Sequence, residues 1–228
     1  MKSLVYVYTD HPMCSIDCAD ATCEVLNQSG MYDARLIGPS AFPKLKFNRK
    51  NLFKADCIVF PGGDGDADQF DKDLYKYTRL VNEYVKRGGR YVGICQGSYF
   101  AGKHYFNLLE GYDAVQYIKT QNACTRRSGP EIVKINWKGN GPLPIYFHDG
   151  AAFKDEGRRD CFANVLGRYK NKEIAALVQT KGNGSIGVIG PHPEAQKWWF
   201  YSQNRIKDGW TYGVQHEILL DLMEYVFE

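Results

Sequence analysis

The residue with the clearest chemical potential in this 228-residue chain is Cys95. It lies in the run Gly-Ile-Cys-Gln-Gly at 93–97, directly after an apolar segment. A nucleophile on a tight turn between a strand and a helix, with small flanking residues, is typical of a nucleophile elbow. Unpaired N–H groups and the dipole at the start of the following helix favour a thiolate. The sequence therefore predicts that Cys95 is a nucleophile.

A base for this thiol is predicted at His192. The tripeptide His192-Pro193-Glu194 follows the apolar segment 185–189 and a Gly-Pro turn, so His192 leaves a strand end as Cys95 does. Glu194 can reach one imidazole nitrogen while the other nitrogen faces the thiol, and a base oriented by a third group is what a cysteine nucleophile requires. We expect Cys95, His192 and Glu194 to form a catalytic triad.

A thiol that attacks a carbonyl also needs hydrogen-bond donors for the oxyanion that forms. Two backbone N–H groups are candidates. One belongs to Gln96, directly after the nucleophile, and the other to Gly63, in the Pro-Gly-Gly turn at 61–63 that ends an apolar strand. Because glycine leaves the backbone of such a turn open, we predict an oxyanion hole formed by Gly63 and Gln96.

The elements that must position these residues alternate between short apolar strands and helix-length segments in the first half of the chain. This pattern is typical of a parallel sheet with crossover helices. From about residue 114 the pattern changes to short strand-like runs separated by Gly and Pro, which predicts added antiparallel strands. The expected strands are 4–8, 34–37, 57–60, 91–94, 132–135, 145–147, 174–178 and 186–189, and the expected helices are 17–28, 74–87 and 215–227.

Composition sets limits on the class of protein. The formal net charge is only +3, with basic and acidic residues interleaved, which gives no electrostatic case for nucleic acid. No stretch approaches the roughly 20 apolar residues of a membrane span, and the N-terminal apolar run is too short for a signal peptide. Without a linker or repeat, residues 1–228 are expected to form a single domain, and we expect a cytoplasmic protein without a membrane partner.

The seven cysteines are an odd number and indicate reduced thiols, not a disulfide framework. Three of them lie close together, at Cys14, Cys18 and Cys23. Their spacings match neither common zinc pairs nor ferredoxin runs. We expect ordinary helix and loop thiols there, and no metal or organic cofactor.

Three motifs in order, Pro-Gly-Gly at 61–63, Gly-x-Cys-x-Gly at 93–97 and His-Pro-Glu at 192–194, resemble the oxyanion turn, elbow and His–Glu pair of class I glutamine amidotransferases. A finer resemblance is to the N-terminal domain of eukaryotic-type biotin-protein ligases. It rests on the segments 60–63, 93–100, 128–130, 146–153 and 190–194. The resemblance implies a flavodoxin-like three-layer α/β sandwich with a mostly parallel sheet. It also implies candidate substrate-binding residues at Gly62, Tyr99, Ser128, His148, Asp149 and Gly150.

One position departs from the amidotransferase pattern. Those enzymes usually carry Gln four residues after the nucleophile, where it helps to hold the substrate glutamine, and this chain has Tyr99. With this departure, the resemblance implies a preserved thiol-hydrolase apparatus with an altered specificity pocket, or a pocket retained for binding. The sequence also contains no Gly-rich biotin-binding motif of the ligase, so we do not expect biotinylation by this chain alone.

Three functional hypotheses follow. The first is a cysteine-dependent amidohydrolase or amidotransferase that forms a thioester on a small-molecule amide, with a separate synthetase or ligase as a candidate protein partner. The second is a non-catalytic regulatory module that binds a small molecule or a protein in the same cleft. The third is another thiol chemistry that resembles the Parkinsonism-associated deglycase-like group. That group is expected to place an early carboxylate beside the cysteine, and Asp10 is the candidate here.

Overall fold

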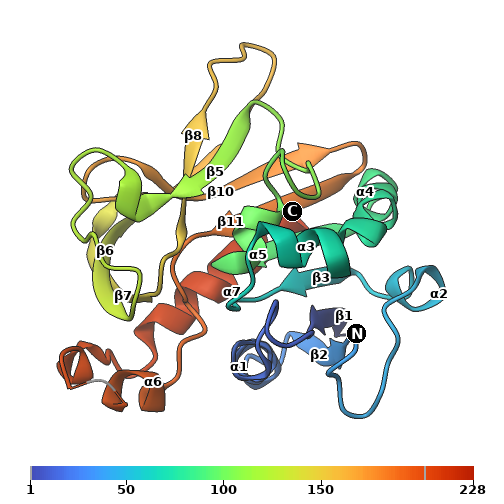
Figure 1. The fold of residues 1–228 in the computed structure, drawn as a ribbon, viewed down its shortest axis with the longest axis horizontal. Helices are drawn as coiled ribbons and strands as arrows, with labels where there is room; N and C mark the ends of the chain where they lie inside the picture. The colour runs from blue at the N-terminus through green and yellow to red at the C-terminus, as the bar shows by residue number, and fades with distance from the viewer. Residues whose placement is uncertain (1, 203) are drawn as a thin grey trace.

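Helices cover both faces of one large mixed sheet in the computed structural model, which describes residues 2–202 and 204–228 (Figure 1). The first half of the chain supplies most of the parallel part of this sheet, in the order β2-β1-β3-β4-β11. Its elements are β1 (Ser3–Tyr8), α1 (Ile16–Gln28), β2 (Tyr32–Ile37), α2 (Arg49–Leu52), β3 (Cys57–Phe60), α3 (Ala67–Asp73), α4 (Thr78–Lys86), β4 (Arg90–Ile94) and α5 (Gln96–Phe100).

The second half extends the sheet with antiparallel strands. After β11 (Gly184–Ile189) the order continues β10-β9-β6-β7, and β8 pairs with both β5 and β10. These strands and the last helices are β5 (Tyr112–Gln116), β6 (Glu131–Trp137), β7 (Asn140–Phe147), β8 (Ala151–Asp155), β9 (Asn164–Tyr169), β10 (Ile174–Lys181), α6 (Lys197–Tyr201) and α7 (Val214–Phe227). β11 belongs to both parts, because it runs parallel to β4 and antiparallel to β10.

The core is divided by the alternation of side chains along the strands. On β1, Val5 and Val7 are buried in a cluster with residues of α1 and α7. Tyr6 and Tyr8 face the opposite way, into a second cluster with residues of α4 and α5. Both faces of the sheet are therefore covered. The predicted three-layer α/β architecture with added antiparallel strands is confirmed.

Helix α1 begins directly after β1, at the carboxyl edge of the sheet. Ser15 is its N-cap, and its side-chain oxygen accepts a hydrogen bond from the backbone N–H of Cys18 at 3.1 Å. The buried residues of the helix recur at helical spacing and pack on the sheet. Gly30, with φ at +75°, follows the end of the helix. This placement brings the first turn of α1 next to the strand ends.

The helix predicted over 74–87 is wrong in its first part. The chain forms α3, then a 3-10 turn at Tyr75–Tyr77, then α4. Helix α3 starts earlier because the side chain of Asp66 caps it, accepting a hydrogen bond from the N–H of Gln69 at 2.9 Å. Leu74 and Val81 are both buried in the same cluster. The apolar spacing thus correctly indicated residues that are buried on the same side, although these residues do not belong to one helix.

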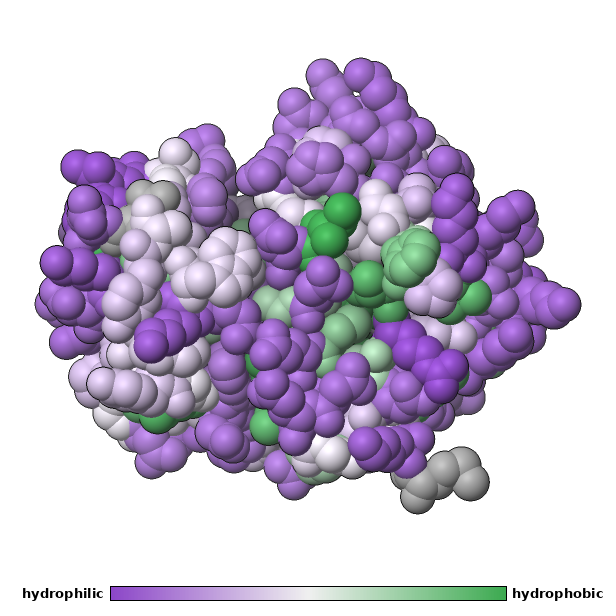
Figure 2. Space-filling model, turned by 90° about the horizontal axis from the view of Figure 1, so that it is seen from below, coloured by the Kyte–Doolittle hydropathy of each residue, from purple (hydrophilic) through white to green (hydrophobic). Residues whose placement is uncertain are grey.

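Within the described residues, no helix has the length and apolar character that crossing a membrane requires. Figure 2 shows the molecule from below the view of Figure 1. This surface is largely hydrophilic, with apolar side chains gathered near its middle.

Candidate active site

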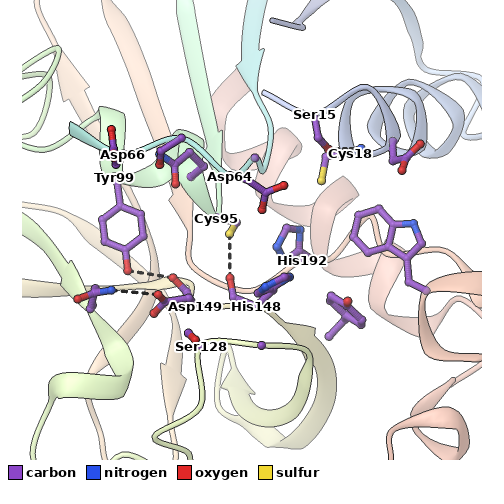
Figure 3. Close-up of a pocket in the computed structure, with 18 of the residues that line it drawn as sticks. Ser15, Cys18, Asp64, Asp66, Cys95, Tyr99, Ser128, His148, Asp149 and His192 are labelled. Carbon is purple, nitrogen blue, oxygen red and sulfur yellow. Dashed lines mark hydrogen bonds between the residues drawn. The ribbon is translucent and has the colours of Figure 1, made fainter. Parts of the chain in front are cut away.

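The carboxyl ends of the parallel strands meet at a cavity of about 640 Å³. Ligand sites of open α/β sheets form at this edge. The structure brings most of the predicted site residues together there (Figure 3). Those that line the cavity are Cys95, His192, Gly63, Gln96, Tyr99, Ser128, His148 and Asp149. Glu194, Gly62 and Gly150 do not line it.

Cys95 lies on a strained turn between β4 and α5. Its φ is +49° and its ψ −109°, a conformation that a residue with a side chain rarely adopts. The neighbouring glycines make the turn feasible. A Cβ on Gly93 would lie 2.4 Å from the backbone oxygen of Gly97, and a Cβ on Gly97 would lie 1.8 Å from that of Phe60. The strain and the close approaches are those of a nucleophile elbow.

His192 and Glu194 form a buried pair at the end of β11. The ring Nδ1 lies 2.8 Å from Glu194 Oε1, and Glu194 is fully buried. The backbone N–H of His192 donates to the oxygen of Tyr146 at 2.9 Å, and the Tyr146 ring packs edge-on against the imidazole. Burial alone would lower the pKa of His192. The charges of Cys95 and Glu194, with hydrogen bonds to the thiols of Cys18 and Cys95, raise that pKa well above its ordinary value.

The thiol of Cys95 has a well-formed hydrogen bond to a backbone oxygen. Its Sγ donates to the oxygen of His148 at 3.3 Å (Figure 3). Only a protonated thiol can donate, and the same oxygen would repel a thiolate. The backbone oxygen of His148 is therefore placed to accept a hydrogen bond from the thiol form of Cys95.

Two hydrogen bonds connect the glycine turn after β3 to the start of α5. The side-chain amide of Gln96 donates to the oxygen of Gly65 at 2.6 Å, and the N–H of Gly97 donates to the oxygen of Pro61 at 3.1 Å. A Cβ on Gly63 would lie 2.0 Å from the oxygen of Met13, so only glycine fits there. The N–H groups of Gly63 and Gln96 find no acceptor within residues 2–202 and 204–228.

Comparison with known proteins places this geometry in a family. A family model described as "Biotin-protein ligase, N terminal" matches residues 5–111. The chain is 31% identical over 172 residues to phosphoribosylformylglycinamidine synthase subunit PurQ of Prochlorococcus marinus, covering 63% of this chain and 72% of that protein. The chain belongs to the class I glutamine amidotransferase-like family. The predicted resemblance is confirmed.

Two further comparisons agree with this assignment. The biotin-protein ligase of Schizosaccharomyces pombe is 27% identical over 194 residues, which is 72% of this chain. The chain spans only 29% of the length of that ligase. A glutamine amidotransferase structure from Thermotoga maritima superposes with a TM-score of 0.65 at 14% identity, covering 100% of this chain and 99% of that one. That likeness shows the fold of the family.

This family member has a tyrosine in contact with the far wall of the cavity. The hydroxyl of Tyr99 donates to the backbone oxygen of Asp149 at 3.0 Å, and the side chain of Gln116 donates to Asp149 Oδ2 at 3.0 Å. The other carboxylate oxygen, Oδ1, is buried and has no hydrogen-bond partner in the described part of the chain. Burial raises the pKa of the Asp149 carboxyl. Asp149 thus carries one unpaired acceptor among the described residues, and this atom is buried.

The glycines predicted to contact substrate serve packing. A Cβ on Gly62 would lie 2.5 Å from Cε1 of His192, and a Cβ on Gly150 would lie 2.1 Å from the oxygen of Gly190. Both glycines allow neighbours of the thiol to come close and do not themselves face the cavity. Asp10 is also absent from the lining residues. Its carboxylate instead accepts a hydrogen bond from the hydroxyl of Tyr8 at 3.0 Å.

Cys18 is the residue that sequence reasoning missed. It lines the cavity from the first turn of α1, and a Cβ on Gly62 would lie 3.1 Å from its Sγ as well as close to the ring of His192. Cys14 is fully buried and Cys23 is partly buried, and neither lines the cavity. The available signal was position: Cys18 lies in the first turn of the helix that follows β1, at the sheet edge where Cys95 was placed.

Aromatic residues of α6 close one side of the site. Trp198 and Trp199 line the cavity, and the ring of Trp199 packs edge-on against His192 at 5.5 Å between centroids. Trp199 and Phe200 are buried, whereas Trp198 is exposed. The aromatic cluster therefore holds the imidazole in place and also forms a wall of the cavity.

Proposed function

We propose that this protein is a cysteine-dependent amidohydrolase or amidotransferase that uses Cys95, His192 and Glu194. The observation that carries the proposal is the combination of a strained elbow at Cys95 with a buried His192–Glu194 pair 2.8 Å apart. The membership of the chain in the class I glutamine amidotransferase-like family supports it.

The proposed reaction begins when His192 accepts the proton of the Cys95 thiol. The thiolate attacks the carbonyl carbon of an amide, and the backbone N–H groups of Gly63 and Gln96 stabilise the oxyanion. His192 then gives its proton to the leaving nitrogen, so that ammonia or an amine departs and a thioester remains. Water, deprotonated by His192, attacks the thioester. The products are a carboxylic acid and the free thiol. Glu194 holds the ring and stabilises the imidazolium in each step.

The proposed substrate is a small-molecule amide, with glutamine the first to test. It would enter the cavity between Tyr99, Ser128 and the His148–Asp149 turn. A substrate amine or amide would donate to the buried Oδ1 of Asp149 only after the side chain moves to expose that oxygen. Bound substrate must also displace the contact between Cys95 Sγ and the oxygen of His148.

A separate partner protein forms part of the proposal. PurQ of Prochlorococcus marinus is described as a subunit of a synthase. We propose that this chain likewise delivers ammonia to a separate synthetase or ligase. Residues 1–228 are proposed to act as one domain, since the sheet runs without a break from β2 to β7 and α7 packs on β4, β10 and β11.

The test is the rate at which a neutral haloacetamide alkylates Cys95 between mildly acidic and alkaline pH, read by peptide mass spectrometry. Cys124 is exposed and serves as a reference thiol in the same sample. The proposal expects Cys95 labelling below the ordinary thiol pKa of about 8.5, slowed in His192→Ala, followed by ammonia release from an amide that is lost in Cys95→Ala. Slow labelling with the same pH profile in both proteins would instead favour a non-catalytic binding module.

A further inference from the structure

A second thiol reaches the imidazole of His192 from outside the predicted triad. Cys18 points toward the ring from α1, whereas Cys95 approaches it from the end of β4 (Figure 3). The Sγ of Cys18, a ring nitrogen of His192 and a carboxylate oxygen of Glu194 all lie within 4.8 Å of one another. The three residues are 9%, 3% and 0% exposed.

These three groups are ligand types that Zn²⁺ uses in proteins. At ordinary zinc–ligand bond lengths of about 2.0–2.3 Å, tetrahedral ligand atoms are separated by roughly 3.5 Å. The ligand atoms of the cluster lie within 4.8 Å of one another, so side-chain shifts would bring them to that spacing. A thiolate and a carboxylate together carry two negative charges, and the imidazole is neutral when it binds a metal. A divalent cation would therefore make the buried cluster electrically neutral.

Glu194 supplies an independent indication of a ligand. Its Oε2 is buried and has no hydrogen-bond partner among the described residues, while Oε1 contacts His192. A carboxylate oxygen buried without a partner is costly, and such an atom calls for an ion or another unobserved partner. Cys18 and His192 both line the 640 Å³ cavity, so an ion in the cavity would meet these two groups first.

We propose that Cys18, His192 and Glu194 form a binding site for a thiophilic divalent cation, with Zn²⁺ as the ion of matching chemistry. Water from the cavity can supply a fourth ligand. Binding displaces the thiol proton of Cys18 and occupies a nitrogen of His192. The bound ion would then inhibit the chemistry of Cys95, because His192 could no longer accept its proton. This inhibition rests on the proposed function, but the binding does not.

The test measures binding of Zn²⁺ by competition with a chromophoric chelator, and the thiolate-to-metal charge-transfer band with Co²⁺. The wild type and the control Cys124→Ser should bind one ion with the same affinity and show the band. Cys95→Ala should also bind one ion and show the band. Cys18→Ser should lose the band and bind at least about 100-fold more weakly, since even outer-shell changes cost 10–100-fold. In the unmutated protein, Zn²⁺ should also protect Cys18 from alkylation, which tests the site without a variant.

Three outcomes would overturn the site: no binding by the wild type, an unchanged band in Cys18→Ser, or loss of binding in Cys95→Ala. The inhibition is tested separately, by Cys95 alkylation with and without Zn²⁺. We expect Zn²⁺ to slow labelling in the wild type and not in Cys18→Ser. Fast labelling of Cys95 without Zn²⁺ binding would refute the metal site and leave the proposed function intact. Binding of Zn²⁺ by a protein whose Cys95 labels slowly even without Zn²⁺ would support the metal site and refute the proposed function.

Discussion

Replacing Glu194 by Gln tests how the buried pair activates the thiol. The substitution keeps the size of the side chain and removes the charge 2.8 Å from Nδ1 of His192. Both side chains are buried, so water cannot replace the lost interaction. A hydrogen bond to a charged group contributes about 1.5–3 kcal/mol. The pKa of His192 should therefore fall, and at 1.36 kcal/mol per tenfold change the imidazolium becomes about 10- to 100-fold less favourable.

The expected result is slower alkylation of Cys95. A thiolate beside an imidazolium becomes less favourable when the imidazolium loses its carboxylate, so at neutral pH the labelling rate should fall by about 10- to 100-fold. The rate should recover at alkaline pH, where the thiol ionises without help. The assay is the pH profile of haloacetamide labelling at the Cys95 peptide, with Cys124 as reference.

A matched control is Glu217→Gln, the same chemical change on the exposed side of α7. It should leave the labelling profile unchanged. Thermal unfolding of both variants checks that Glu194→Gln remains folded. A folded Glu194→Gln protein with the wild-type profile would refute the reasoning, because the carboxylate would then have no influence on the charge of the ring.

Three further predictions concern the elbow, the turn and the histidine. Gly97→Ala should destabilise the fold by about 3 kcal/mol, because its Cβ would lie 1.8 Å from a backbone oxygen. The control Gly141→Ala, whose Cβ would have no atom within 4 Å, should not destabilise it. Chemical denaturation measures both variants, and equal stabilities would contradict the packing argument. Tyr99→Phe removes the hydrogen bond to Asp149 and should lower the free energy of unfolding by about 1 kcal/mol. It should also speed alkylation of Cys95, because it loosens the turn that carries the oxygen of His148. An unchanged or slower alkylation rate would contradict this. The raised pKa of His192 contributes stability below its unfolded value of about 6.5, and this contribution is lost as pH rises through the folded pKa. The stability advantage of wild type over His192→Ala should therefore shrink from pH 6 to 9 in denaturation curves, and a constant or growing advantage would count against it.

Much of the fold follows from local pattern. The segment 57–60 was predicted as a strand and is β3 with the same bounds, because four buried apolar residues end at Pro-Gly-Gly. The start of the second helix could not be read from apolar spacing, because Asp66 caps α3 and Leu74 ends it. Strand β9 was not predicted. Its residues include Gly167, which weakens a strand signal and yet allows Trp137 to pack 3.0 Å from where a Cβ would be.

Parts of the candidate site were likewise predictable from the sequence, and other parts were not. Short motifs identified Cys95, His192 and Gly63, since each lies at the end of a strand whose direction the sequence indicates. The roles of Gly62 and Gly150 depend on which backbone lies opposite, and that is set by tertiary packing. Cys18 was missed for a related reason: its spacing from Cys14 and Cys23 is uninformative. Only the docking of α1 on β1 and β2 brings its thiol close to the ring of His192.

The contact between Cys95 and the oxygen of His148 has a consequence for regulation of the thiol. The carbonyl oxygen of His148 can accept a hydrogen bond from a thiol at this position and cannot do so from a thiolate. The turn that carries it is held by Tyr99 and Gln116, and Asp149 at its centre has a φ of +48°, which a residue with a side chain rarely adopts. A substrate or partner that moves this turn would remove the competing acceptor and leave His192 as the neighbour of the thiol. We therefore expect occupancy of the cavity to change the reactivity of Cys95, and the Tyr99→Phe variant tests how strongly the turn restrains it.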